Sequence, residues 1–165
     1  MIFLTVGTQF PFDRLVKIVD ELVGKNGFKS EVYGQIGNSA YQPDNFEAVV
    51  SLKKKVFDKH VRESTCIIAH AGMGTITMAL ENHKPLLVMP RLKKYNEVVN
   101  DHQLAIARKF EQLGHILVAY TEEQLPDKLR ELKTFVPKPR ENQAEIITAR
   151  ISKFLNEIRI SKEQL

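Results

Sequence analysis

Short runs of β-branched and other apolar residues alternate with longer segments of helical periodicity along the whole chain. This alternation predicts an α/β fold, in which a parallel sheet carries helices on both faces. The expected strands span residues 2–6, 30–36, 46–52, 65–70, 86–90 and 116–119. The expected helices span residues 53–64, 74–82, 101–113, 122–132 and 141–158, and an earlier helix starts near Pro11 and Asp13 and stops near residues 24–27. We therefore expect one doubly wound, Rossmann-like domain over residues 1–165.

The composition fits such a domain and sets limits on its surroundings. A chain of 165 residues with 43% hydrophobic content can bury one core but not two. Its net charge of +4 suits an anionic ligand or an acidic membrane surface, and nucleic acid is not expected. The single cysteine, Cys66, cannot form an internal disulfide, and no apolar run reaches the roughly 18 residues of a membrane span. We expect a cytoplasmic protein that reaches a membrane only through a partner or its surface.

The stretch CIIAHAGMGT, residues 66–75, ends an apolar strand on His70 and continues with Gly72 and Gly74. In open α/β sheets ligands bind beyond the carboxyl ends of the strands, where glycines let the backbone come close. The amides at the start of the following helix and the helix dipole favour an anion such as a phosphate or a diphosphate. Thr75 can add a hydroxyl donor, and His70 can donate to an oxygen of a leaving group. From these residues alone, a phosphate site and a purely structural turn are equally supported.

Other familiar sites do not fit this turn. A dinucleotide fingerprint needs a third glycine where Thr77 stands, and no Gly-Lys-Ser/Thr of a P-loop is present. No Gly-x-Ser-x-Gly elbow occurs. We expect no metal and no cofactor, because the five histidines lack the paired spacing of metal ligands; they are His60, His70, His83, His102 and His115.

A longer stretch, AHAGMGTITMALENHKPLLVMPRLKKYNEVVNDHQLAIA at residues 69–107, resembles the nucleotide-sugar-binding motif of family 28 glycosyltransferases. In these two-domain, metal-independent enzymes of the GT-B fold, the motif belongs to the C-terminal half. The likeness extends from the opening MIFLTVGTQFPFDRLVK to about residue 156. It is strongest to small single-domain subunits of transferases that act on dolichol-linked sugars or build bacterial capsules and exopolysaccharides.

The resemblance implies a role for each matching residue. The glycine turn would hold the diphosphate of a UDP-sugar donor through His70, Gly72, Met73, Gly74 and Thr75. The Asp/Asn-His-Gln element would contact the donor sugar through Asn100, Asp101, His102 and Gln103. The loop after the first strand would close on the same cleft through Gly7, Thr8 and Gln9.

One position departs from the family pattern. Related motifs carry a glutamate eight residues after the histidine, where it binds the ribose hydroxyls, and this chain has Met78 there. Glu81 lies three residues further along the same helix and can take over the ribose contact. The alternative is that Glu81 is an ordinary exposed acid.

The resemblance also implies a mechanism and partners. The chain would be the donor-binding half of an inverting transferase, in which helix-end amides and His70 stabilise the departing diphosphate. The general base and the acceptor pocket would come from a membrane-anchored partner subunit, and the acceptor would be a lipid-linked saccharide. Two alternatives remain open: a non-catalytic UDP-sugar-binding regulatory or scaffold subunit, and an unrelated phosphate-binding module.

Several other features have simpler interpretations. Asn100 and Asp101 also suit a helix N-cap. We expect Arg91, Lys93 and Lys94 to form a solvated basic loop, although phosphate, acceptor or anionic lipid is an alternative contact. The last helix carries an apolar stripe that we expect to pack on the core or, alternatively, against another subunit; it consists of Ile147, Ile151, Phe154 and Ile158.

Overall fold

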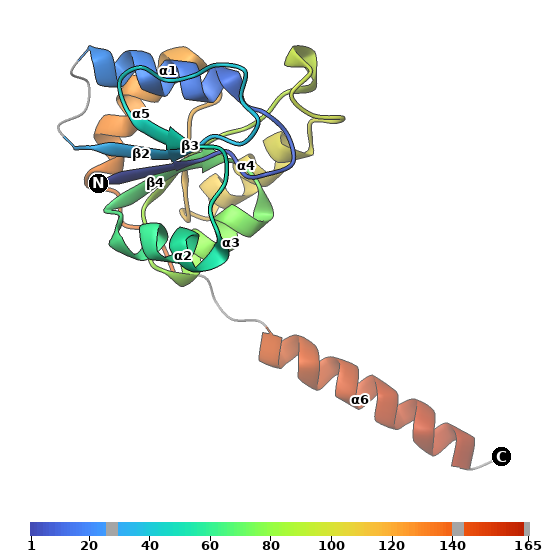
Figure 1. Cartoon of the computed structure of the whole chain (residues 1–165). Coiled ribbons are helices and arrows are strands. Elements are labelled where there is room, and N and C mark those ends of the chain that lie inside the picture. Colours follow the sequence, from blue (N-terminus) through green and yellow to red (C-terminus); the bar gives the residue numbers. More distant parts are fainter. Residues whose placement is uncertain (26–29, 140–143, 164–165) are drawn as a thin grey trace.

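The computed structural model describes residues 1–25, 30–139 and 144–163. Its centre is a six-stranded parallel sheet with the strand order β3-β2-β1-β4-β5-β6 (Figure 1). The strands are β1 (Ile2–Thr5), β2 (Val32–Gln35), β3 (Glu47–Val49), β4 (Cys66–His70), β5 (Leu86–Met89) and β6 (Leu117–Val118). The predicted α/β fold with a parallel sheet is therefore confirmed.

The helices alternate with the strands as the sequence predicts. They are α1 (Asp13–Gly24), α2 (Lys54–Glu63), α3 (Met73–Glu81), α4 (His102–Gln112), α5 (Leu125–Leu132) and α6 (Ala144–Glu163). Two short 3₁₀ helices, η1 (Lys93–Tyr95) and η2 (Glu122–Gln124), precede α4 and α5. The predicted start of the last helix, residues 141–143, lies outside the described residues, and α6 continues past the expected end at residue 158.

Helices cover both faces of the sheet. On one face α1 and α5 pack on alternate strand residues such as Leu4 and Ile68. On the other face α2, α3 and α4 cover Phe3, Ile67 and Val88. Because parallel strands are buried on both sides, their sequences are continuous apolar runs, and β1 and β5 are buried over their full length.

The order of the strands reverses between β1 and β4, the two central strands. Ile2 pairs with Val32 of β2 on one side and with Cys66 of β4 on the other. The chain leaves β1 toward one edge of the sheet and leaves β4 toward the other, so a crevice opens beyond their carboxyl ends. The loops after β1 and β4 carry two of the sequence motifs that predict a ligand.

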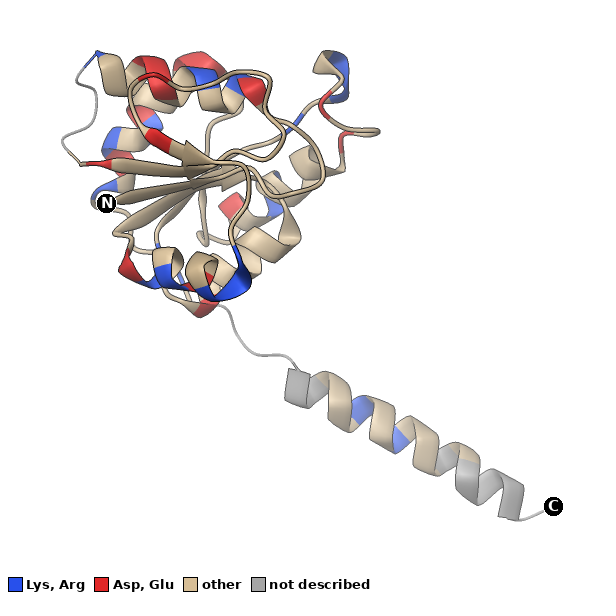
Figure 2. Ribbon diagram, viewed as in Figure 1, with Lys and Arg blue, Asp and Glu red and all other residues tan. Residues whose placement is uncertain are grey.

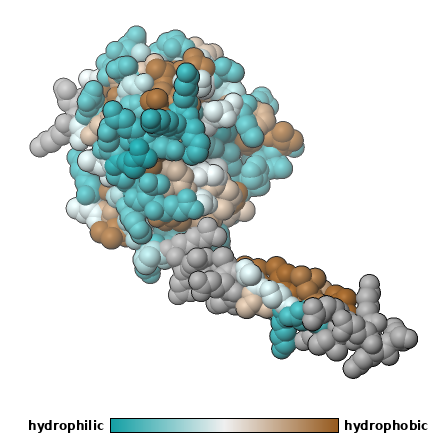
Figure 3. Space-filling view, turned by 60° about the horizontal axis from the view of Figure 1, so that its bottom comes forward, coloured by the Kyte–Doolittle hydropathy of each residue, from teal (hydrophilic) through white to brown (hydrophobic). Residues whose placement is uncertain are grey.

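The last helix departs from the expectation. Its apolar stripe does not pack on the core, since its members are 41% to 60% exposed; they are Ile147, Ile151, Phe154 and Ile158. Figure 1 shows α6 standing apart from the sheet, and Figure 3 shows the apolar side chains along one side of it. The expectation of core packing was wrong because helical periodicity shows that a helix has an apolar face but not what covers it. Within the described ranges, no helix combines the length and the hydropathy that a membrane span requires.

Candidate functional site

A cleft of about 470 Å³ lies beyond the carboxyl ends of the central strands. Its volume falls in the range of small-molecule sites. The cleft brings together the loop after β1, the turn after β4 and the start of α4, which the sequence predicts as parts of one site. The predicted residues that line it are Gly7, Thr8, Gln9, His70, Gly72, Met73, Gly74, Thr75, His102 and Gln103. Glu81, Asn100 and Asp101 do not line it.

The start of α3 gives the cleft its hydrogen-bond donors. Gly72 is the N-cap, and the first amide that closes a helical turn is that of Ile76, which donates to the carbonyl oxygen of Gly72 (3.0 Å). The amides of Met73, Gly74 and Thr75 precede this turn and have no acceptor inside the helix. They face the cleft with the positive end of the helix dipole, which suits an anionic ligand.

The two glycines of the turn differ in what surrounds them. A Cβ added to Gly72 would overlap Nε2 of His70, so no larger residue fits there without moving the imidazole. A Cβ added to Gly74 would meet no protein atom within 4 Å. Only the close approach of a ligand would therefore exclude a side chain at Gly74.

His70 ends β4 with its imidazole between two glycines. A Cβ added to Gly7, whose φ is +75°, would lie 2.9 Å from Cε1 of the ring. Burial and then the charge of Arg91 lower the pKa of His70 from 6.5 to about 4, and a polar contact with the Thr5 backbone opposes the shift. Nδ1 of His70 is buried and has no hydrogen-bond partner among the described residues. His70 is therefore neutral at physiological pH and can donate one hydrogen bond without acting as an acid.

Arg91 corrects the expectation of a solvated basic loop. Lys93 and Lys94 are exposed, as expected, but Arg91 is only 3% exposed and lines the cleft. Its guanidinium lies 4.9 Å from the centre of the Phe12 ring. The expectation was wrong because the acceptors of Arg91 lie in the loop after β1, about 80 residues earlier in the chain. No local pattern in the sequence reveals them.

The polar residues at the start of α4 have two roles. Gln103 borders the cleft, whereas Asn100 and Asp101 bond neighbouring residues of the protein. Gln103 is buried, and its Oε1 accepts the backbone N–H of Arg91 (3.1 Å), which leaves Nε2 to donate into the cleft. Asn100 orients the exposed His102, because its Oδ1 contacts Nδ1 of His102 (2.5 Å) and accepts the His102 backbone N–H (3.2 Å). Asp101 is the N-cap residue but makes no side-chain cap bond; its Oδ1 accepts the N–H of Lys93 (2.7 Å).

Glu81 lies at the other end of α3. It is the exposed last residue of this helix, eight residues after Met73, and so about 12 Å further along the axis. Met78 is partly buried and packs against the core on the α3 side of the sheet. The structure thus places Glu81 outside the cleft, as an ordinary exposed acid would be.

The loop between β5 and α4 has an anchor that the sequence did not indicate. The guanidinium of Arg14 in α1 donates to both carboxylate oxygens of Glu97 (2.8 and 2.9 Å), and Glu97 also accepts the N–H of Leu92 (2.8 Å). Burial lowers the pKa of Arg14, but Glu97 and then Glu122 outweigh this effect and raise it. The pair joins residues 83 positions apart and fastens the loop after β5 to α1.

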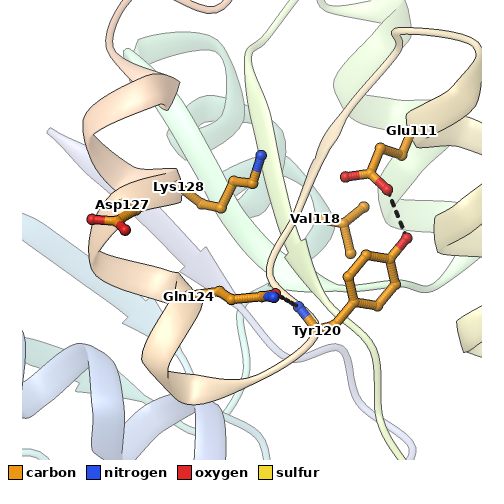
Figure 4. Close-up of a pocket in the computed structure, with 6 residues that line it drawn as sticks. All are labelled: Glu111, Val118, Tyr120, Gln124, Asp127 and Lys128. Carbon is orange, nitrogen blue, oxygen red and sulfur yellow. Dashed lines mark hydrogen bonds between the residues drawn. The ribbon is translucent and has the colours of Figure 1, made fainter.

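A second pocket, of about 310 Å³, lies between α4 and α5 and contains no predicted site residue. It is lined by Glu111, Val118, Tyr120, Gln124, Asp127 and Lys128 (Figure 4). Its main polar groups satisfy each other, since Tyr120 donates its hydroxyl to Glu111 (2.7 Å) and its N–H to Gln124 (2.8 Å). Burial and the contact with Glu111 raise the pKa of Tyr120 to about 12. None of the residues lining this pocket belongs to the glycine turn or to the other predicted motifs.

The residues that the structure describes contain no group of three or more His, Cys, Asp or Glu side chains placed to hold a metal ion. Figure 2 shows that acidic and basic residues occur along the helices and loops around the sheet. The first cleft has a different character, because no aspartate or glutamate is among the residues that line it. Its walls offer backbone amides, two histidines, Gln103 and Arg91.

Comparison with known proteins gives a consistent result. Residues 1–158 match the model of a family described as the glycosyltransferase family 28 C-terminal domain. Human UDP-N-acetylglucosamine transferase subunit ALG13 is 30% identical over 124 residues, which cover 70% of this chain and 10% of that protein. The chain thus spans about a tenth of the length of this relative.

Two solved structures share the fold. An NMR solution structure of ALG13 has a TM-score of 0.57 at 24% identity and covers 84% of this chain and 87% of its own. The crystal structure of MurG from Acinetobacter baumannii has a TM-score of 0.57 at 20% identity, and it covers 81% of this chain and 42% of its own. At these identities the two structures support the architecture of the sheet and helices.

Proposed function

The chain belongs to the glycosyltransferase family 28 C-terminal domain family, and from this premise we propose that it is the donor-binding subunit of an inverting, metal-independent UDP-sugar glycosyltransferase. The proposed donor is a UDP-hexose or a UDP-N-acetylhexosamine. UDP-N-acetylglucosamine is the first donor to test, because the human relative is named for its transfer. The proposed acceptor is a lipid-linked saccharide.

One observation carries the proposal: the glycine turn after β4 and the His102–Gln103 pair of α4 line the same cleft. The amides of Met73, Gly74 and Thr75 suit a diphosphate, and Nε2 of Gln103 suits a sugar hydroxyl. The loop of Gly7, Thr8 and Gln9 lies on the same cleft. Motifs separated by some 30 residues in the sequence thereby supply the two kinds of contact that a nucleotide sugar needs.

The geometry supports an electrostatic mechanism. When the bond between the sugar and the diphosphate breaks, negative charge grows on the departing phosphate oxygens. The helix-end amides of α3 and the buried charge of Arg91 favour this charge without a metal ion. His70 is neutral and adds a hydrogen bond. In inversion, the acceptor hydroxyl attacks the opposite face of the sugar and loses its proton to a general base.

We propose that a partner subunit supplies this base, because no carboxylate lines the cleft in the described part of the chain. The partner would also supply the acceptor pocket and the membrane anchor, which would bring this chain to the cytoplasmic face of a membrane. The exposed apolar stripe of α6 is the surface that we propose for the partner contact. An uncovered stripe of this kind is typical of a helix that docks in the groove of another protein.

The test compares the chain alone with the chain co-expressed with its partner. Calorimetry with UDP-N-acetylglucosamine and other UDP-sugars should show binding to the chain alone, whereas transfer to a lipid-linked acceptor should require both subunits. Excess EDTA should leave transfer unchanged. Full transfer by the isolated chain would contradict the partner proposal. Binding without transfer, even with the partner, would favour the regulatory or scaffold alternative.

A further inference from the structure

Arg91 follows β5 and joins three segments of the cleft wall. Its backbone N–H donates to Oε1 of Gln103 at the start of α4 (3.1 Å). Its Nη2 donates to the carbonyl oxygens of Val6 and Phe10, both at 2.6 Å. Its Nε donates to the carbonyl oxygen of Pro11 (3.3 Å). One side chain thus fastens the loop after β1 to the end of β5, and its backbone fixes Gln103.

The charge of Arg91 is buried without an acidic partner. The side chain is only 3% exposed, and none of the ion pairs among the described residues includes it. Burial lowers the pKa of Arg91 to about 10, opposed by the more distant Glu97, so the guanidinium remains positive at neutral pH. Carbonyl oxygens accept from its Nε and Nη2 but do not neutralise its charge. A buried cation of this kind is stabilised when an anion arrives beside it.

We propose that Arg91 is a positioning and charge-balancing residue of the donor site. It holds the loop of residues 7–10 in place at the cleft, and its positive charge is balanced by the diphosphate of the bound nucleotide. The proposal rests on the donor cleft proposed above. It adds to that cleft a residue outside the glycine turn and the His-Gln element, and it explains why a basic residue is buried at this point of the fold.

The neighbouring basic residues do not have the same role. Lys93 and Lys94 are exposed and do not line the cleft. The Nζ of Lys94 lies 4.6 Å from the centre of the Tyr95 ring in the same loop. Replacing Lys94 by Met removes the same unit of charge from the same loop without touching the loop after β1. Lys94→Met is therefore a matched control for Arg91→Met.

The experiment measures the affinity for UDP and for uridine by NMR titration of the whole chain, together with backbone order parameters of residues 7–10. In Arg91→Met, UDP affinity should fall about 30-fold, as for loss of a charge-assisted contact, while uridine affinity should change less than about threefold. The order parameters of residues 8–10 should fall toward the flexible range, below roughly 0.6. Lys94→Met should leave all three quantities unchanged.

Arg91→Lys separates the two parts of the proposal. It keeps the charge but cannot make the three side-chain bonds, so it should retain the preference for UDP over uridine while residues 8–10 become mobile. If Arg91→Met does not fold, this variant still tests the positioning role. Equal losses of UDP and uridine affinity in Arg91→Met would overturn charge balancing, and unchanged loop order in both variants would overturn positioning.

These outcomes are distinguishable from failure of the proposed function. If the unaltered chain does not bind UDP, then the assignment of the cleft as the donor site is wrong, and so is the charge-balancing role of Arg91. The order parameters require no ligand and decide the positioning role in that case too.

Discussion

Substitutions at Gly74 should have opposite effects on the stability of the fold and on ligand binding. It lies inside the first turn of α3, and a Cβ built there would meet no protein atom within 4 Å. Glycine within a helix costs about 0.5–1 kcal/mol relative to alanine. A protein under no constraint at this position would gain stability from a larger residue. The glycine is explained if a ligand approaches the backbone closely.

We predict that Gly74→Ala stabilises the fold by about 0.5 kcal/mol and weakens UDP-sugar binding at least tenfold, since the new methyl group occupies the side from which the diphosphate approaches. Gly74→Val should abolish binding while the chain remains folded. Urea unfolding gives the stability and calorimetry gives the affinity.

Two further variants serve as controls for Gly74. Gly72→Ala displaces His70 and should reduce both stability and binding. Glu81→Gln lies at the far, exposed end of α3 and should change neither. Unchanged donor affinity in Gly74→Val would show that the nucleotide does not approach this turn.

The lowered pKa of His70 predicts a pH dependence of stability. The imidazole titrates at about 4 in the folded chain and near 6.5 when unfolded. Between these values the unfolded chain binds the additional proton, so the free energy of unfolding falls as the pH drops from 6.5 to 4. The loss is complete below pH 4, where both states are protonated.

We expect His70→Asn to remove this contribution. Its free energy of unfolding should depend less steeply on pH between 4 and 6.5 than that of the unaltered chain, as measured by urea unfolding at a series of pH values. His83→Asn makes the same change of side chain at an exposed histidine and is the matched comparison. Parallel pH profiles for His70→Asn and the unaltered chain would contradict the lowered pKa.

At the scale of the elements, the sequence predicts most of the fold and most of the cleft. Apolar runs and helical periodicity place the six strands and the helices that follow them, because each pattern reports which faces are buried. The convergence of the turn after β4 with the start of α4 also follows, since carboxyl ends of parallel strands meet at one edge of the sheet. Gly72 and Gly74 are therefore found at the cleft without any tertiary information, whereas Gln103 is named only through the resemblance to family 28 glycosyltransferases.

Contacts between distant segments could not be predicted in this way. The acceptors of Arg91 and the carboxylate partner of Arg14 lie about 80 residues away in the chain, and a lone basic residue in a loop gives no sign of either. Glu81 and Met78 show a related limit. The spacing along α3 suggests that Glu81 can make the ribose contact of the glutamate that is missing at position 78. Only the position of the helix shows that Glu81 lies away from the cleft.

The apolar stripe of α6 gives a prediction at this scale. Ile151→Lys combined with Phe154→Lys should change the free energy of unfolding of the domain by no more than about 0.5 kcal/mol, as for other exposed positions. The same variant should no longer co-purify with the acceptor-side partner. Ala149→Lys is the control, since it lies on the opposite side of the helix and is also exposed.

The two measurements separate the interpretations of α6. A loss of several kcal/mol on adding the two lysines would show that the stripe packs on the domain in solution. Unaltered co-purification would place the partner contact elsewhere on the chain.

At the scale of the whole molecule, two features fit the proposal of a donor-binding half. The cleft offers donors and positive charge but is lined by no carboxylate in the described part of the chain. The apolar side of α6 is uncovered there. In this proposal a second subunit supplies the general base at the cleft and has a groove that binds the apolar side of α6. The transfer assay with and without this partner tests the two features together.

The strand order also determines how the chain can acquire its structure during synthesis. β1 is synthesised before the other five strands, yet it lies at the centre of the sheet, between β2 and β4. Its pairing with β4 begins with Ile2 opposite Cys66, so β1 stays without this neighbour until the chain has been translated as far as β4. Loop closures of this length are slow compared with those of hairpins. The cleft, which needs both central strands, thus cannot form before β4 has been translated.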